Sequence, residues 1–101
     1  MNTREHLLIC LSEECAEVSQ RVSKALRFGL DEIQPGQHKT NADRIVVELA
    51  DLLAVVTLLE REGAFKAHGD HFLDLVEMKR VKLATFMQYA AECGTLEPLP
   101  A

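Results

Sequence analysis

The chain has 101 residues, a formal net charge of −5 and an apolar fraction of 48%, which suits one small domain with a modest core. The acidic charge argues against binding to a nucleic-acid polymer, because that binding needs a basic face. No apolar run reaches the ~20 residues of a membrane span, and no secretory signal is evident. The three cysteines form no paired motif, so we expect free thiols and a cytoplasmic location.

The first predicted helix runs from about Thr3 to Phe28. Asn2 and Glu5 have the spacing of a capping box at its start, and Gly29 is a natural stop at its end. Apolar side chains recur along it at steps of three and four residues, which is typical of one helix face. These residues are Leu7, Leu11, Cys15, Val18, Val22 and Ala25.

The second predicted helix runs from about residue 42 to residue 62, with Thr40 or Asn41 as its cap. Across residues 45–59 the only polar side chains are Glu48, Asp51 and Thr57. A helix that is apolar on nearly every side is typical of a central, buried position. The length of the run and the absence of turn residues favour a helix over a strand.

The third predicted helix runs from about Asp70 to Glu92, with Asp70 as its cap. The fold class is therefore all-α, a bundle of three main helices in one domain over residues 1–96, followed by a flexible tail over residues 97–101. Three helices, one of them apolar nearly all round, make an incomplete bundle. We expect a second copy of the chain to complete a four-helix core, as a homodimer or homotetramer.

Two pairs of carboxylates lie on the first two predicted helices at three-residue spacing, so each pair shares one side of its helix. The pairs are Glu14 with Glu17 and Glu48 with Asp51. An ionised carboxylate in a packed helix costs several kcal/mol unless protonation, a salt bridge or a cation compensates it. Four carboxylates and no histidine at a Glu-x-x-His step favour Mg²⁺ or Mn²⁺ over a di-iron site. For the first pair, an ordinary solvated acidic face is the alternative.

The acidic segments read EECAE at residues 13–17 and ELAD at residues 48–51. In this order, on successive helices, they resemble the EExxE and ExxD motifs of the MazG-like, all-α nucleoside triphosphate pyrophosphohydrolases. The resemblance covers most of the chain. The connection between the motifs is long for that family because it contains LDEIQPGQHKTN, and the chain has no tryptophan for base stacking.

The resemblance implies Mg²⁺-dependent hydrolysis of an NTP or dNTP between its α and β phosphates, giving the monophosphate and pyrophosphate. Glu14, Glu17, Glu48 and Asp51 are then the expected metal ligands. Glu13 is expected to hold a second ion or to orient the attacking water, and Glu14 to contact that water.

An acidic protein must bind the triphosphate through cations, so basic side chains near the motifs are candidate phosphate ligands. Arg21 and Lys24 lie on the same side of the first helix as Glu17, and Lys79 and Lys82 lie on the third helix. Ion pairing along the helix and a solvated basic face are the respective alternatives.

Two other functions remain open on sequence grounds. One is a non-catalytic helical dimerisation module, whose apolar second helix is only a dimer core. The other is a metal-dependent regulator that binds nucleotides without hydrolysing them. Metal binding separates the first from the enzyme, and product analysis separates the second.

Overall fold

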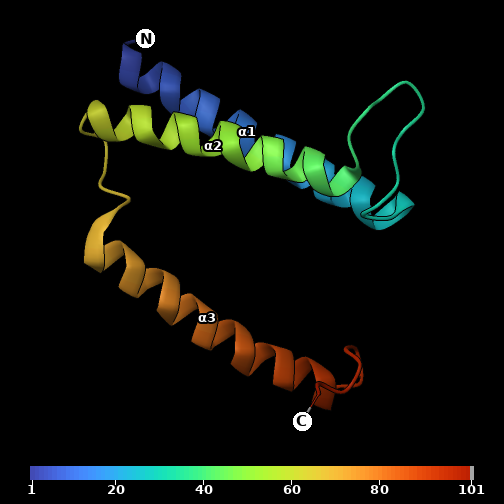
Figure 1. Cartoon of the computed structure of the whole chain (residues 1–101). Coiled ribbons are helices and arrows are strands. Elements are labelled where there is room, and N and C mark those ends of the chain that lie inside the picture. The colour runs from blue at the N-terminus through green and yellow to red at the C-terminus, as the bar shows by residue number, and fades with distance from the viewer. Residues whose placement is uncertain (101) are drawn as a thin grey trace. The chain divides into compact units, whose positions relative to one another are not determined.

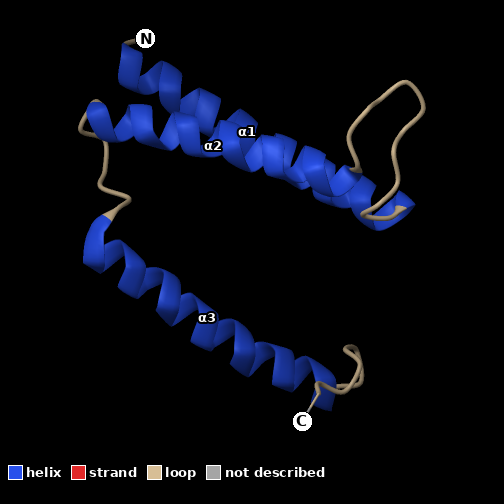
Figure 2. Ribbon diagram, in the orientation of Figure 1, coloured by secondary structure: helices blue, strands red, loops and turns tan. Residues whose placement is uncertain are grey.

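The computed structural model describes residues 1–100 and contains, within them, three helices and no strand (Figures 1 and 2). The helices are α1 (Thr3–Phe28), α2 (Asn41–Arg61) and α3 (Gly69–Glu92). The all-α prediction is confirmed, and the predicted helix ends agree with the structure to within one residue. Completion of the bundle by a second chain stays a prediction.

The ends of α1 and the start of α2 follow the predicted capping chemistry. The Glu5 amide donates to Asn2 Oδ1 at 2.8 Å and the Asn2 amide donates to Glu5 Oε2 at 3.2 Å, which completes the capping box. Gly29 ends α1 with a φ of 104°, in a region that residues with a Cβ rarely adopt. The Asp43 amide donates to Thr40 Oγ1 at 3.1 Å, so Thr40 caps α2.

The predicted cap of α3 is wrong. Its N-cap residue is His68, in an extended conformation, and no side chain makes a capping hydrogen bond. The chain turns at Gly69, which has a φ of 85°, and the helix begins at that residue. Asp70 therefore lies inside the first turn, where its charge suits the positive end of the helix dipole.

The chain divides into two compact units, one from Met1 to Lys66 with α1 and α2, and one that contains α3. The prediction of a single domain over residues 1–96 with a tail from residue 97 stays a prediction. Ala101, at the end of that tail, lies outside the described residues.

In the first unit, α1 and α2 lie side by side and run in opposite directions (Figure 1). Ala25 on α1 and Leu59 on α2 are buried between them. Other members of the predicted α1 stripe are half-buried, but Cys15 and Val22 are exposed. The stripe is wider than the strip of surface that one neighbouring helix covers.

The apolar surface of α2 is mostly uncovered within its own unit, and its burial in a completed bundle stays a prediction. Val46 and Leu53 are each 62% exposed. One neighbouring helix shields only one side of a cylinder, and α1 is the only other helix in this unit. An apolar surface of this kind is typical of an interface between protein chains.

The loop between α1 and α2 is held in place through Asn41, which is only 4% exposed. Its side-chain amide donates to Gly29 O and to Glu32 Oε1, both at 2.9 Å. The Asn41 and Ala42 backbone amides donate to the carbonyls of Glu32 and Leu30 at 3.0 and 2.9 Å. These bonds tie the first turn of α2 to the beginning of the loop.

We propose that a second copy of the chain covers the exposed face of α2, and Leu53→Asp tests this. Leu53 is solvent-exposed within the unit of α1 and α2, so a charge there leaves the hairpin intact. In an interface the unpaired charge would cost several kcal/mol and should dissociate the assembly.

Sedimentation of the wild type and of Leu53→Asp measures the mass of each protein in solution. The control is Gln20→Asp, which adds the same charge on an exposed position of α1. A wild-type protein of monomer mass would contradict the proposal.

Replacement of Asn41 by alanine should lower the free energy of unfolding by about 2 kcal/mol, because two hydrogen bonds are lost and a partly buried carbonyl keeps no side-chain partner. Urea denaturation followed by circular dichroism measures the change. His38→Ala, an exposed change in the same loop, should stay within about 0.5 kcal/mol of wild type. Equal effects of the two substitutions would show that Asn41 does not hold the loop.

Candidate active site

Carboxylates from α1 and α2 converge at the middle of the helix pair. One oxygen each of Glu14, Glu48 and Asp51 lies within 4.8 Å of the others. Glu14 comes from α1, and the other two lie one turn apart on α2. Burial of both α2 acids was expected, but Glu48 is half-buried and Asp51 is exposed, because no further helix of this unit covers that side.

The electrostatics of this cluster centre on Glu14. Burial raises the pKa of Glu14 above its ordinary value of 4.5, and the neighbouring carboxylates raise it further, with Asp51 first and Glu48, Glu17 and Glu13 after it. Glu14 Oε2 is buried and has no hydrogen-bond partner. A divalent cation would supply the missing partner and offset the repulsion. The three oxygen donors therefore fit Mg²⁺ or Mn²⁺ by their chemistry.

Glu13 and Glu17 lie on exposed positions of α1, and neither belongs to the group of three converging carboxylates. Their charges nevertheless act on Glu14, as its raised pKa shows. The metal role predicted for Glu17 and the catalytic role predicted for Glu13 stay predictions.

Arg21 links the acidic cluster to a neighbouring basic region. Its Nε lies 3.8 Å from Glu48 Oε1, and the two side chains are only 18% and 15% exposed. Sequence reasoning missed this contact, because it considered pairing of Arg21 with Glu17 along α1. The available signal was the seven-residue step from Glu14, which puts Arg21 on the same face of the helix.

A pocket of about 220 Å³ opens beside Glu48, between α1, the loop and α2. It is lined by Arg21, Gln37, Lys39, Arg44, Val47 and Glu48. Of the basic residues proposed from the sequence, only Arg21 contributes to it. Lys39 lies nine residues before Glu48 and Arg44 lies four residues before it, and both became candidates as phosphate ligands only in the folded chain.

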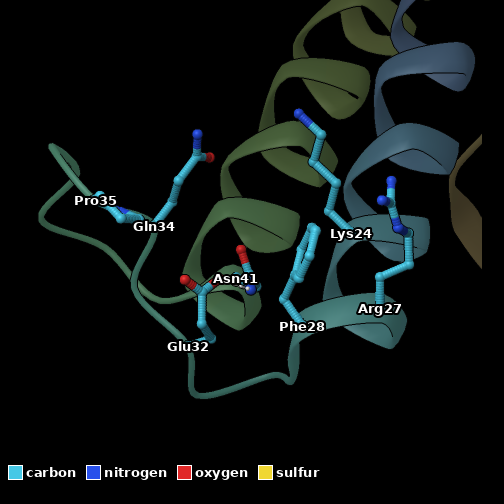
Figure 3. A pocket seen from close by; sticks show the side chains of 7 residues that line it. All are labelled: Lys24, Arg27, Phe28, Glu32, Gln34, Pro35 and Asn41. Atoms are coloured by element: carbon cyan, nitrogen blue, oxygen red, sulfur yellow. Dashed lines mark hydrogen bonds between the residues drawn. The ribbon is translucent and has the colours of Figure 1, made fainter.

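A second pocket, of about 460 Å³, lies where α1 ends and α2 begins (Figure 3). Figure 3 shows Lys24, Arg27 and Phe28 reaching it from the last turns of α1, while the loop and Asn41 complete it. The Arg27 guanidinium lies 4.8 Å from the centre of the Phe28 ring, within the range of a cation–π contact. Lys24, predicted as a phosphate ligand, lines this pocket instead of the basic one.

The other two predicted phosphate ligands, Lys79 and Lys82, occupy exposed positions on α3, in the second unit. Their role in substrate binding stays a prediction.

The family model described as the MazG nucleotide pyrophosphohydrolase domain matches residues 2–77, which include both acidic motifs. No curated protein and no solved structure matches the chain. Within residues 1–100, none of the helices has the length and apolarity that crossing a bilayer requires.

In the metal-free protein, the Glu14 carboxyl should make stability depend on pH. Because its folded-state pKa is raised from 4.5, the folded chain holds the proton more tightly than the unfolded chain. This stabilisation is fully present below the unfolded pKa and is lost as the pH rises through the folded pKa. Glu14→Gln should abolish this part of the pH dependence and raise the Tm at neutral pH.

Thermal melts in a chelator, from acidic to neutral pH, measure the effect. Asp31→Asn, which neutralises an exposed carboxylate in the loop, is the control and should keep the wild-type profile. The same pH profile in Glu14→Gln and wild type would contradict the assignment to Glu14.

Proposed function

Because the chain belongs to the MazG nucleotide pyrophosphohydrolase family, we propose that it hydrolyses a nucleoside triphosphate between its α and β phosphates in a Mg²⁺-dependent reaction. The products are the nucleoside monophosphate and pyrophosphate. The observation that carries the proposal is the convergence of Glu14, Glu48 and Asp51 within 4.8 Å. Such a group of like charges is costly unless a cation binds there.

In this proposal Glu14, Glu48 and Asp51 hold Mg²⁺, and Glu17 completes the set of carboxylates. Bound Mg²⁺ supplies neutralisation of phosphate charge and activation of water at neutral pH. Mn²⁺ offers the same preference for oxygen ligands, so we expect it to substitute.

Residues of the chain are proposed to orient the attacking water and to accept its proton. Hydrolysis adds the water oxygen to one phosphorus, releases the bridging oxygen with the other phosphate and frees one proton. Glu14 is proposed to contact the attacking water, because it belongs to the converging carboxylates and its Oε2 has no hydrogen-bond partner, so that oxygen can accept a hydrogen bond and the proton from the water. Glu13, the preceding residue on α1, is proposed to help orient the water.

The substrate partner in this proposal is a free NTP or dNTP, and the acidic chain is not expected to bind a nucleic-acid polymer. Incubation with each NTP and dNTP, followed by separation of the products, tests both the activity and the base preference. Monophosphate and pyrophosphate in equal amounts would support the proposal. Binding without products would favour the nucleotide-binding regulator, and absence of metal binding would favour the dimerisation module.

The variants Glu48→Gln and Asp51→Asn should each lower Mg²⁺-dependent turnover on the order of a hundredfold or more. Replacing even the groups that support metal ligands commonly costs up to about that factor. Both substitutions keep the side-chain volume, so circular dichroism should show the wild-type helix content. The matched control is Asp43→Asn, an exposed acid on the same helix outside the cluster. Near-normal turnover in either cluster variant would contradict the proposal that these carboxylates hold a catalytic Mg²⁺.

A further inference from the structure

We propose that the pocket formed by Arg21, Lys39 and Arg44 binds the β and γ phosphates of the substrate, the part that leaves as pyrophosphate. Lys39 and Arg44 then act as substrate-binding residues that neither acidic motif predicts. This inference rests on the proposed function and adds the orientation of the triphosphate to it.

The charge of the pocket is the first argument. Three cationic side chains and only one carboxylate, Glu48, line it, although the chain as a whole is acidic. The pocket also lies at the first turns of α2, where the partial positive charge of the helix N-terminus favours an anion. Its volume, about half that of the pocket beside Phe28, suits a compact anion.

Unused hydrogen-bond donors are the second argument. Arg21 Nη1 is buried and has no hydrogen-bond partner, although burying a donor without a partner is costly. Arg44 donates from Nη1 to Gln34 Oε1 at 2.9 Å, which leaves its other N–H groups available. Among residues 1–100, neither Arg44 nor Lys39 has an ion-pair partner. Phosphate oxygens would satisfy these donors, and arginine binds phosphate in a bidentate geometry.

The position of Glu48 is the third argument. This residue belongs to the carboxylate cluster and also lines the basic pocket. A phosphate chain that enters the pocket therefore begins next to the carboxylates that are proposed to hold Mg²⁺. In this arrangement the β and γ phosphates lie in the basic pocket, and the α phosphate lies beside the carboxylate cluster.

The loop between α1 and α2 is held in a conformation that brings Lys39 to the basic pocket. The bonds from Asn41 fix the beginning of the loop to α2, and the Gln37 amide donates to Gln34 O at 2.9 Å. Arg44, which lies on α2, donates a hydrogen bond to Gln34 of the loop. Lys39 directly precedes the Thr40 cap, so the start of α2 determines its position. The long connection between the two acidic motifs therefore has a function, which is to supply phosphate-binding residues.

A consequence is that the nucleoside extends away from the loop. Cleavage between the α and β phosphates puts the nucleoside and the pyrophosphate on opposite sides of the reacting bond. With the pyrophosphate at Lys39 and Arg44, the pocket beside Phe28 does not receive the base. This separates the proposal from the opposite orientation, in which the aromatic ring at the end of α1 would stack on the base.

The experiment compares the binding of the two products to the full chain in the presence of Mg²⁺. Isothermal titration with inorganic pyrophosphate and, separately, with a nucleoside monophosphate is made on wild type, Lys39→Ala and Arg44→Gln. We expect pyrophosphate to bind each variant about tenfold to a hundredfold more weakly, since each loses a charge-assisted contact. Monophosphate affinity should change less than about twofold. Lys39→Arg should restore most of the pyrophosphate affinity because it restores the positive charge.

Two controls make the outcome specific. Lys66→Ala removes an exposed lysine of the same unit that lines neither described pocket, and it should bind both products like wild type. Phe28→Leu should also leave both affinities unchanged. Circular dichroism and melting temperature show that each variant is folded.

The results separate this inference from the proposed function. Wild-type pyrophosphate affinity in Lys39→Ala and Arg44→Gln would overturn the inference even if the wild-type enzyme hydrolyses NTPs. Selective loss of monophosphate binding in these variants, or in Phe28→Leu, would overturn it in favour of the opposite orientation. Selective loss of pyrophosphate binding in a protein without hydrolytic activity would support the pocket and refute the proposed reaction.

Discussion

The antiparallel register of α1 against α2 is the constraint on which the site depends. On each helix the acidic residues lie one or two turns from a basic residue. On α1 these are Glu14 and Arg21. On α2 they are Asp51, Glu48 and Arg44. Because the helices run in opposite directions, Glu14 lies beside the acids of α2 and Arg21 lies beside the same pocket as Arg44. A shift of one turn, about 5.4 Å along either axis, would separate Glu14 from at least one of its two partners on α2.

This register has an electrostatic cost that the hairpin only partly offsets. The carboxylates of the cluster raise the pKa of Glu14, and Arg21 contacts Glu48 only at the long distance of 3.8 Å. Tighter ion pairs would stabilise the metal-free chain but would also occupy the carboxylate oxygens. The arrangement leaves an acceptor on Glu14 and a donor on Arg21 without partners, so a cation and an anion bound side by side would satisfy both.

The packing of the hairpin has a similar incompleteness. Ala25 and Leu59 are the buried apolar residues, whereas Val46 and Leu53 face solvent. A two-helix unit has too little interior to bury an apolar helix on all sides, so the stability of the chain is expected to depend on further contacts. Of the two carboxylates on α2, Glu48 is half-buried beside Arg21 of α1 and Asp51 is exposed, and the exposed apolar surface of α2 stays free for assembly.

The sequence by itself determined the all-α class, the helix ends to within one residue, the capping residue Asn2 and the acidic motifs that identify the family, because these depend on local periodicity, local hydrogen bonds and short spacings. The sequence left Thr40 and Asn41 both open as the cap of α2. It also placed Glu14, Glu48 and Asp51 on the correct faces of their helices. Only the tertiary structure decided that Arg21 contacts Glu48, that Glu17 lies outside the converging group, and that Lys39 and Arg44 line the basic pocket. These relations depend on the axial register of two helices and on the course of a twelve-residue loop, residues 29–40, and neither is encoded in a local pattern. Exposure of Asp51 likewise depends on what else packs against α2, which the periodicity of one helix does not specify.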